Sequence, residues 1–216
     1  MTIAFCFLEV IMEKSNTRKE ILKASLDLFS VNGYEATSIS QIADAVGIRK
    51  ASLYSHFAGK QDILDAVIDI TLDGYVVHSI FRNSDWSDPA FTNDKTGMTA
   101  EDVADMVMAQ IRYILHDPFI SKGRKMLQIE QFRNRKLAEL QTKLNYEDIL
   151  KYFKGMIRFM IGQNVLKSAD PDIMAAQFVS PITVWINLCD REPEREDEVL
   201  ELVNKHVIQF FEVYGK

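Results

Sequence analysis

The chain has 216 residues, of which 47% are hydrophobic and 26% are charged, and its formal net charge at pH 7 is -6. This composition is typical of a globular protein and excludes disordered and fibrous chains. The two cysteines, Cys6 and Cys189, lie far apart in the sequence, so we expect no disulfide framework and a cytoplasmic, reducing location.

The charge is divided unevenly along the chain. Residues 13–60 carry seven Lys or Arg against five Asp or Glu, a charge of +2, whereas residues 61–216 carry eighteen against twenty-five, a charge of -7. This asymmetry indicates an N-terminal part that tolerates a polyanion and a larger acidic body that does not. The small excess of positive charge does not establish nucleic-acid binding by itself.

The first residues form an apolar stretch, MTIAFCFLEVIM, over positions 1–12. It lacks a basic start and is too short to span a bilayer, so a signal peptide is not expected. We expect residues 1–14 to be an N-terminal extension, either a short packed or disordered segment or an upstream start with Met12 as the alternative initiator. Elsewhere no uncharged stretch reaches membrane-spanning length, and no membrane partner is expected.

The N-terminal quarter reads as short helices with recognisable starts and stops. Thr17 with Glu20, and Ser38 with Gln41, fit capping boxes, and Gly47 offers a left-handed stop for the second helix. These signals and the helical spacing of apolar residues predict helices over about 17–32, 38–46 and 50–56, and a long helix from 60 onward.

The rest of the chain also follows helical spacing, with a loop expected over 83–98. Further helices are expected over about 99–116, 119–133, 147–165, 171–188 and 199–214. No strand-type alternation or repeat interrupts them. The sequence therefore predicts an all-α fold of about nine helices, with an N-terminal domain over 15–62 and a larger domain over 63–216.

Two short helices joined by a glycine-containing turn form a helix-turn-helix motif, in which the second helix enters the major groove of DNA. Leu53 and Phe57 are expected to face inward and hold this helix on the domain. Its exposed start would present four residues to double-stranded DNA: Arg49, Lys50, Ala51 and Ser52.

The strings LFSVNGYEATSISQIADAVGI (28–48) and ASLYSHFAGKQDIL (51–64) resemble the N-terminal domain of the tetracycline-repressor (TetR/AcrR-like) family of transcriptional regulators. The resemblance covers about 50 residues, roughly a quarter of the chain. It implies a three-helix DNA-binding domain followed by a helical domain for effector binding and dimerisation. Beyond this region only the all-helical layout is similar to the family.

The resemblance also implies roles for single residues in DNA binding. Ser40 and Gln41 match phosphate- and groove-facing positions, and Tyr54 matches a tyrosine that binds a backbone phosphate. His56 precedes the core phenylalanine. Lys60 matches a lysine at a helix start, where an ammonium group, backbone N–H groups and the helix dipole favour a phosphate.

Arg49 departs from the family pattern, which often has serine at this position. Arginine cannot cap the helix as serine does, and its charge opposes the helix dipole by about 0.3–1 kcal/mol. A bidentate arginine–guanine contact is worth about 1–3 kcal/mol of discrimination. Arg49 is therefore a candidate base reader, and a phosphate contact is an equal alternative.

Bulky side chains of the larger domain recur at helical spacing, which by itself indicates core packing. The resemblance implies instead that some of them surround an apolar effector. Tyr113, Tyr152 and Trp185 are favoured, because each combines bulk with one polar group. The full predicted pocket comprises Met106, Tyr113, Met126, Phe132, Tyr152, Met156, Phe159 and Trp185.

The last two predicted helices carry wide apolar faces, which suit either the core of one chain or an interface between two. The resemblance implies a homodimer in which these helices pair with their copies. Two helix-turn-helix motifs would then address two half-sites one helical turn apart. The predicted interface comprises Phe178, Ile182, Val203, Val207 and Phe210.

No string typical of an enzyme is present, and we expect no catalytic residue, no metal site and no cofactor. The sequence thus predicts a DNA-binding regulator, most simply a repressor that a small apolar or amphipathic effector releases from a near-palindromic operator. An activator of the same family fits every residue equally well. A helical-bundle protein that binds small molecules without binding DNA is the other alternative.

Overall fold

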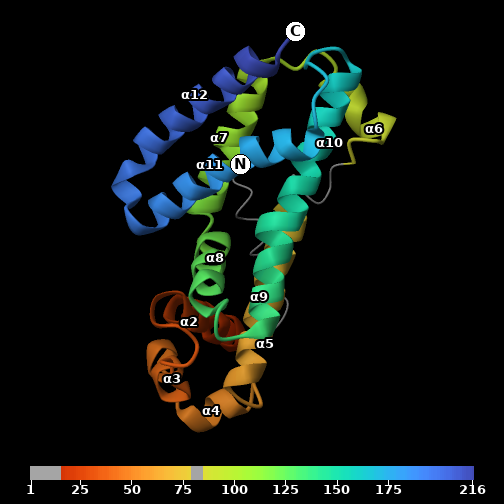
Figure 1. The fold of residues 1–216 in the computed structure, drawn as a ribbon. Helices are drawn as coiled ribbons and strands as arrows, with labels where there is room; N and C mark the ends of the chain where they lie inside the picture. The colour runs from red at the N-terminus through yellow and green to blue at the C-terminus, as the bar shows by residue number, and fades with distance from the viewer. Residues whose placement is uncertain (1–15, 79–84) are drawn as a thin grey trace. The chain divides into compact units, whose positions relative to one another are not determined.

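The computed structural model describes residues 16–78 and 85–216, which fold into helices joined by short connections (Figure 1). The predicted N-terminal extension and positions 83–84 of the predicted loop lie outside these residues. In the described part, extended structure is limited to one isolated bridge between Leu166 and Gly215. The predicted all-α fold class is confirmed.

The chain divides into two compact units, which are considered separately. The first contains the described residues 16–78 together with 116–141, and the second contains 85–115 together with 142–216. The helix-turn-helix residues therefore share a unit with a segment much later in the sequence.

The helices of the first unit begin close to the predicted positions. They are α2 (Asn16–Asn32), α3 (Ile39–Val46), α4 (Lys50–Tyr54), α5 (Lys60–His78), α8 (Pro118–Glu130) and α9 (Arg135–Thr142). Helix α4 ends two residues earlier than predicted. Helix α8 packs against both α2 and α5, which joins it to the N-terminal helices.

Local hydrogen bonds explain these helix starts and stops. The Ser38 hydroxyl accepts a hydrogen bond from the backbone N–H of Gln41, and the side-chain oxygen of Gln41 accepts one from the backbone N–H of Ser38. The predicted capping box of α3 is therefore confirmed. Gly47 ends α3 with φ of 75°, a left-handed conformation that glycine adopts without strain. At the start of α2, Glu20 instead accepts from the Asn16 side chain.

The core of the first unit draws apolar side chains from both parts of the chain. Helix α8 contributes Met126, which is completely buried, to a unit otherwise built by the N-terminal helices. The buried set includes Ile21, Leu22, Leu26, Phe29, Ile42, Leu53, Phe57, Ile63, Leu64, Val67, Ile120, Met126, Leu127 and Leu137.

The second unit contains the remaining helices. They are α6 (Pro89–Thr92), α7 (Ala100–His116), α10 (Asp148–Gly162), α11 (Pro171–Arg191) and α12 (Glu196–Tyr214), with a π-helical turn (Lys143–Glu147) before α10. The predicted loop thus contains one short helix, and α11 continues beyond its predicted end. It stops before Pro193, because the residue preceding a proline disfavours helical geometry.

The core of the second unit is continuous across α7, α10, α11 and α12. Of the described helices, α11 is long and apolar enough to cross a membrane when judged by length and composition only. It places Met174, Phe178 and Ile182 in this core, while Ile173 and Val184 remain 56% and 63% exposed. Apolar residues of α11 therefore lie both on the face that packs in the core and on the face exposed to solvent.

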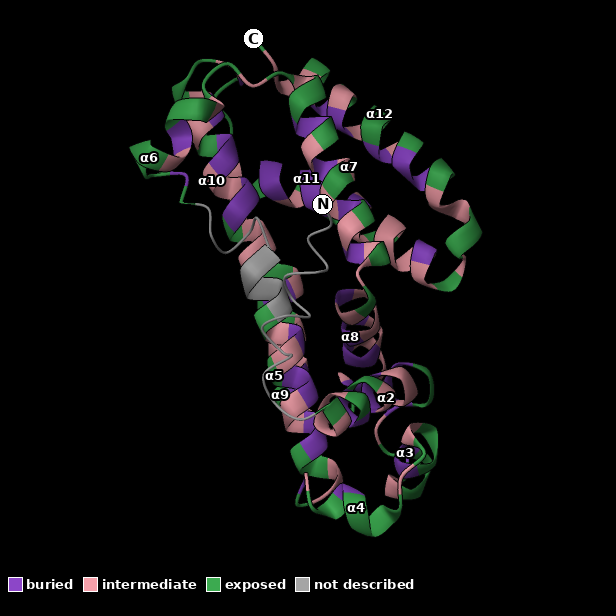
Figure 2. Cartoon of the chain, turned by 180° about the vertical axis from the view of Figure 1, so that it is seen from behind, coloured by how far each residue is buried: buried purple, intermediate pink, exposed green. Residues whose placement is uncertain are grey.

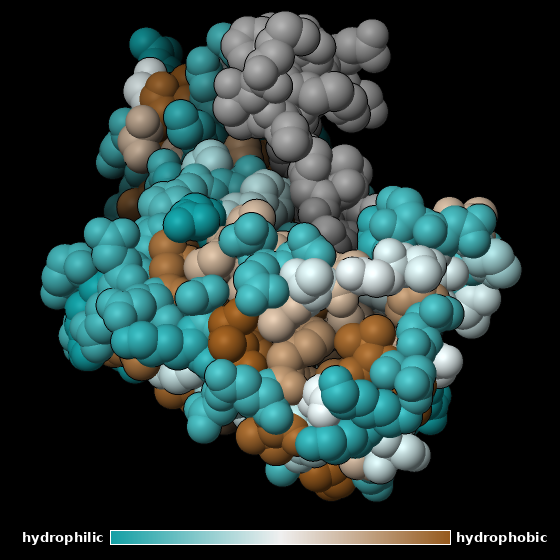
Figure 3. Space-filling model, turned by 90° about the horizontal axis from the view of Figure 1, so that it is seen from above, coloured by the Kyte–Doolittle hydropathy of each residue, from teal (hydrophilic) through white to brown (hydrophobic). Residues whose placement is uncertain are grey.

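Apolar side chains are not confined to the interior. On the face drawn in Figure 3, hydrophobic side chains gather near the middle and hydrophilic ones surround them. Large exposed hydrophobic residues include Val31, Tyr54, Phe132, Tyr146, Ile173, Val184 and Val213.

Candidate functional site

Helix α4 presents its polar residues to solvent and anchors itself through two buried side chains. Leu53 is completely buried and Phe57 is 2% exposed, which confirms the predicted anchors. Tyr54 is 49% exposed, and most of the α4 ribbon has the colour of exposed residues in Figure 2. The exposed residues at its start are Arg49, Lys50, Ala51 and Ser52. The exposed side chains at the start of α4 can contact a molecule outside the chain while the buried anchors of the helix stay in place.

Arg49 occupies the N-cap position of α4 with φ of -71° and ψ of 144°, and its side chain makes no capping hydrogen bond. Across residues 16–78 and 85–216, neither Arg49 nor Lys50 forms an ion pair or a side-chain hydrogen bond. Both cationic groups are therefore available to an anionic or acceptor group from outside the chain.

The two predicted contacts on α3 are also exposed. Gln41 places its carbonyl oxygen 2.8 Å from the Ser38 N–H, so that oxygen is committed to the capping box. Its side-chain NH₂ group remains as a donor toward solvent. Ser40 lies one residue earlier on the exposed surface of the same helix start.

Lys60 and His56 are half-buried where α4 meets α5. The Lys60 ammonium donates to the carbonyl oxygens of Tyr34, at 2.8 Å, and Glu35, at 3.3 Å. It also lies 4.2 Å from the centre of the Tyr34 ring. An ammonium group has three donors, so one remains for the predicted phosphate contact.

The structure distributes the predicted pocket residues between the two units. Met126 is buried in α8 and Phe132 is 90% exposed after it, both in the first unit. The other six lie in the second unit, where Tyr152 and Met156 are buried and Met106, Phe159 and Trp185 pack against the core. Tyr113 lies on α7 of the same unit.

An open cleft of about 820 Å³ runs along α10 in the second unit, and Tyr152 and Phe159 line it. Trp86 forms part of its wall at 8% exposure, with its ring 5.6 Å from each of those two rings. The buried indole N–H of Trp86 has no hydrogen-bond partner within residues 16–78 and 85–216. Burial raises the pKa of the Tyr152 phenol, so that group remains neutral at physiological pH.

The cleft carries charges of both signs. Lys154 and Asp172 form an ion pair, and the Asp85 carboxylate accepts from the Ser87 N–H and hydroxyl. Lys151 and Arg158 line the same cleft without an ion pair or hydrogen bond in the described chain.

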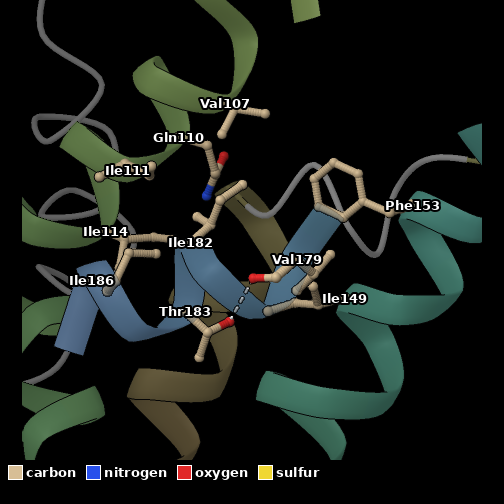
Figure 4. Close-up of a pocket in the computed structure, with 10 residues that line it drawn as sticks. All are labelled: Val107, Gln110, Ile111, Ile114, Ile149, Phe153, Val179, Ile182, Thr183 and Ile186. Atoms are coloured by element: carbon tan, nitrogen blue, oxygen red, sulfur yellow. Dashed lines mark hydrogen bonds between the residues drawn. The ribbon is translucent and has the colours of Figure 1, made fainter. Parts of the chain in front are cut away.

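A second cavity lies between α7, α10 and α11 and measures about 40 Å³ (Figure 4). Its lining is aliphatic and aromatic except for Gln110 and Thr183, and the Thr183 hydroxyl already donates to the Val179 carbonyl. A volume of this size is sufficient for a water molecule or a small group and too small for a drug-sized ligand.

The predicted dimer residues are buried within one copy of the second unit. Phe178, Val203 and Val207 have no exposed surface, and Ile182 and Phe210 are 7% and 6% exposed. The prediction assigned the apolar faces of α11 and α12 to a partner, but those faces fill the core. The exposed apolar residues of these helices include Ile173, Val184 and Val213.

Two further features were not predicted from the sequence. Trp86 packs on Gly155, where an added Cβ would lie 3.0 Å from the indole, so a glycine inside a helical run was the available signal. Glu130 is 1% exposed at the end of α8, and nothing in its sequence neighbourhood indicated burial. Among the described residues, no group of three or more His, Cys, Asp or Glu is placed to hold a metal ion.

The first unit thus has the architecture of a helix-turn-helix protein: a capped helix, a tight glycine turn and an exposed cationic second helix. Residues 21–67 match the family described as bacterial regulatory proteins, tetR family. The repressor KstR2 of Rhodococcus jostii is 42% identical over 60 residues, which cover 28% of this chain and 29% of that protein.

Solved structures extend the likeness to the whole fold. A TetR-family regulator from Mesorhizobium loti covers 94% of this chain and 100% of its own, with a TM-score of 0.64 and 18% identity. A complex of SmeT with triclosan covers 94% of this chain and 93% of its own, with a TM-score of 0.60 and 22% identity. At these identities the likeness concerns the fold.

The chain thus has a segment over residues 21–67 that matches the tetR family of bacterial regulatory proteins, and its fold resembles solved TetR-family structures. The chain spans between 27% and 37% of the length of these curated relatives.

Proposed function

We propose that this protein is a cytoplasmic transcriptional repressor that binds double-stranded DNA through α4 and the start of α3. The observation that carries the proposal is the pair Arg49 and Lys50, which are exposed and have no side-chain partner among the described residues, on a helix fixed by Leu53 and Phe57. An acidic chain with these cations concentrated at one helix start suits a phosphate-lined groove.

The repressor acts as a homodimer on a near-palindromic operator. One α4 is too short to contact more than a few base pairs, whereas two copies address two half-sites and multiply the affinity. The exposed apolar residues of α11 and α12 support pairing through these helices, with Ile173, Ser180 and Val184 spaced along one face of α11. An activator would bind DNA in the same way, and a reporter assay distinguishes the two.

A small amphipathic effector binds the second unit and lowers the affinity for the operator. The cleft along α10 has the volume of a small-molecule site, and the cavity in Figure 4 does not. Trp86 and Phe159 offer aromatic surface, while the indole N–H of Trp86 and the cation of Arg158 offer polar partners. SmeT, which shares the fold, has been solved with triclosan.

A binding selection tests the DNA proposal directly. The unmodified chain is used to select duplexes from a random-sequence library, and its affinity for the selected duplex is measured across salt concentrations. We expect the logarithm of the affinity to fall linearly with the logarithm of salt, by about 0.9 for each phosphate contact. Selection of no duplex, or an affinity independent of salt, would contradict the proposal.

Matched lysine variants locate the interface. Lys50→Ala is expected to weaken binding and to lower the salt slope by about 0.9 if it removes one phosphate contact. Lys205→Ala removes the same charge from α12 in the second unit, where Lys205 pairs with Glu201, and is expected to leave both values unchanged.

Tryptophan fluorescence tests the effector site, because the chain has only two tryptophans. In a Trp185→Phe background, Trp86 alone reports on the cleft. Triclosan serves as the probe, and quenching that Phe159→Ala weakens at least about threefold would support this site. Unchanged emission from Trp86 during a titration that does release DNA would place the effector elsewhere.

A further inference from the structure

The last residue of α8 is a carboxylate in an unfavourable place. Glu130 is 1% exposed, so its charge has left water, and it lies at the C-terminal end of a helix, where the dipole disfavours a negative charge. An exposed carboxylate would keep its hydration and avoid the first of these costs. Its burial therefore needs a partner inside the first unit.

That partner is the turn between α2 and α3. The Tyr34 N–H donates to the Glu130 Oε1 atom at 2.8 Å, across 96 positions of sequence. Gly33 makes the approach possible, because an added Cβ at this residue would lie 2.7 Å from the same oxygen. Gly33 also has φ of 80°, which favours glycine independently. The turn is thus shaped to receive the carboxylate.

The carbonyl and hydroxyl groups of Tyr34 are held by residues of α5. The Tyr34 carbonyl oxygen accepts from the Lys60 ammonium at 2.8 Å, and the Tyr34 hydroxyl donates to Gln61 at 3.2 Å. Its ring packs edge-on against Phe29 of α2, with the centres 5.6 Å apart. Tyr34 therefore connects α8, α2 and the start of α5, and α3 begins only a few residues later.

We propose that Glu130 is a positioning residue for DNA binding, which sets the turn from which α3 and α4 are presented. Glu130 does not touch DNA in this proposal; it fixes the Tyr34 backbone, and Lys60 fixes the opposite side. The inference rests on the proposed DNA-binding function. It assigns to the end of α8 a direct influence on the orientation of the helix-turn-helix.

The test compares Glu130→Ala and Glu130→Gln with the unmodified chain on the duplex that the unmodified chain selects. Affinity is expressed per folded molecule, with the folded fraction measured by circular dichroism. We expect Glu130→Ala to lose at least about tenfold in affinity, and Glu130→Gln to lose roughly threefold, because a neutral acceptor forms the weaker hydrogen bond. The salt slope should stay unchanged, since no phosphate contact is removed.

A second readout follows the hydrogen bond itself. In ¹⁵N-labelled protein the Tyr34 amide proton should move upfield in Glu130→Gln and further in Glu130→Ala, in the same order as the affinities. Asp27→Asn is the control, because it removes the Asp27–Lys122 ion pair, another link between α2 and α8, whose two side chains are partly exposed to solvent. It should change neither the Tyr34 signal nor the affinity.

The outcomes separate this inference from the proposed function. If the unmodified chain selects no duplex, the proposed function fails. If it does, and Glu130→Gln moves the Tyr34 signal while the affinity per folded molecule is unchanged, Glu130 is not a positioning residue. A shifted Tyr34 signal with unchanged affinity per folded molecule in Glu130→Ala would also overturn the inference. If the alanine variant does not fold, the affinity of the glutamine variant is the test.

Discussion

Arg49 illustrates how a single residue can be locally unfavourable and still fit its site. It leaves α4 without a side-chain cap, which is worth about 1 kcal/mol at typical helix starts, and places a cation where the dipole disfavours it. A base contact worth about 1–3 kcal/mol would offset these terms. Its guanidinium is exposed and forms no ion pair with another residue that the structure describes, which is consistent with that role.

We therefore predict that Arg49→Ala weakens binding to the selected duplex by about tenfold and relaxes the preference at one base pair of each half-site. The measurement is a competition assay with duplexes mutated at each position in turn. Equal weakening on every duplex would instead make Arg49 a phosphate contact. Arg49→Ser, which restores a capping side chain, should lose the base preference while improving thermal stability.

At the scale of elements, α5 and α8 approach each other closely at one glycine. Gly123 on α8 faces Thr71 on α5, and a Cβ added at Gly123 would overlap the Thr71 methyl group. Thr71 is 2% exposed and its hydroxyl donates to the Val67 carbonyl, so the side chain has little freedom to move. The close spacing of α5 and α8 therefore depends on glycine, which has no side chain, at position 123.

Gly123→Ala is accordingly expected to lower the free energy of unfolding by about 1–3 kcal/mol, measured by urea denaturation. Adding Thr71→Ser, which removes the methyl group, should restore part of the loss. Gly162→Ala is the control: its position at the end of α10 is open, so alanine should stabilise the chain by a few tenths to about 1 kcal/mol. Equal losses for both variants would argue against close helix packing as the cause.

At the scale of the whole molecule, the second unit presents apolar surface that one copy of the chain leaves exposed. Val184 on α11 and Val213 on α12 are 63% and 56% exposed, although both helices also supply the core. The proposed dimerisation would cover this surface, and it would bring two copies of the short helix α4 to two half-sites.

Val184 would lie at the interface of the proposed dimer, so Val184→Glu is predicted to raise the dimer dissociation constant by about 100-fold or more, because it would bury an unpaired charge there. Sedimentation velocity measures the change, and operator affinity should fall with it. Val31→Glu is the matched control on α2, where the valine is 77% exposed. An unchanged dimer in the Val184 variant would place the interface elsewhere.

Local signals in the sequence were sufficient for most helix boundaries and for the helix-turn-helix. The capping box at Ser38, the stop at Gly47 and the anchors Leu53 and Phe57 all depend on neighbours close in sequence. Predictions that depended on distant contacts fared differently. Phe178, among the proposed dimer residues, lies in the core, because an apolar stripe does not specify which apolar surface covers it.

Polar contacts between residues far apart in the sequence were also not predicted. The sequence placed Lys60 correctly at the start of α5 but gave no sign that its ammonium binds the Tyr34 carbonyl. Likewise, Glu130 ends α8 like any exposed acidic residue, and only the fold brings it to Gly33. Such contacts require the tertiary arrangement of three helices.

The close fit of Gly33 and Glu130 has a consequence for evolution. A side chain at position 33 would collide with the carboxylate, and without that carboxylate the Tyr34 N–H would lose its partner. A substitution at either position alone would therefore destabilise this turn. Homologues that retain this contact should therefore vary at the two positions together, so covariation across their sequences is a record of whether this turn is held from α8 in each lineage.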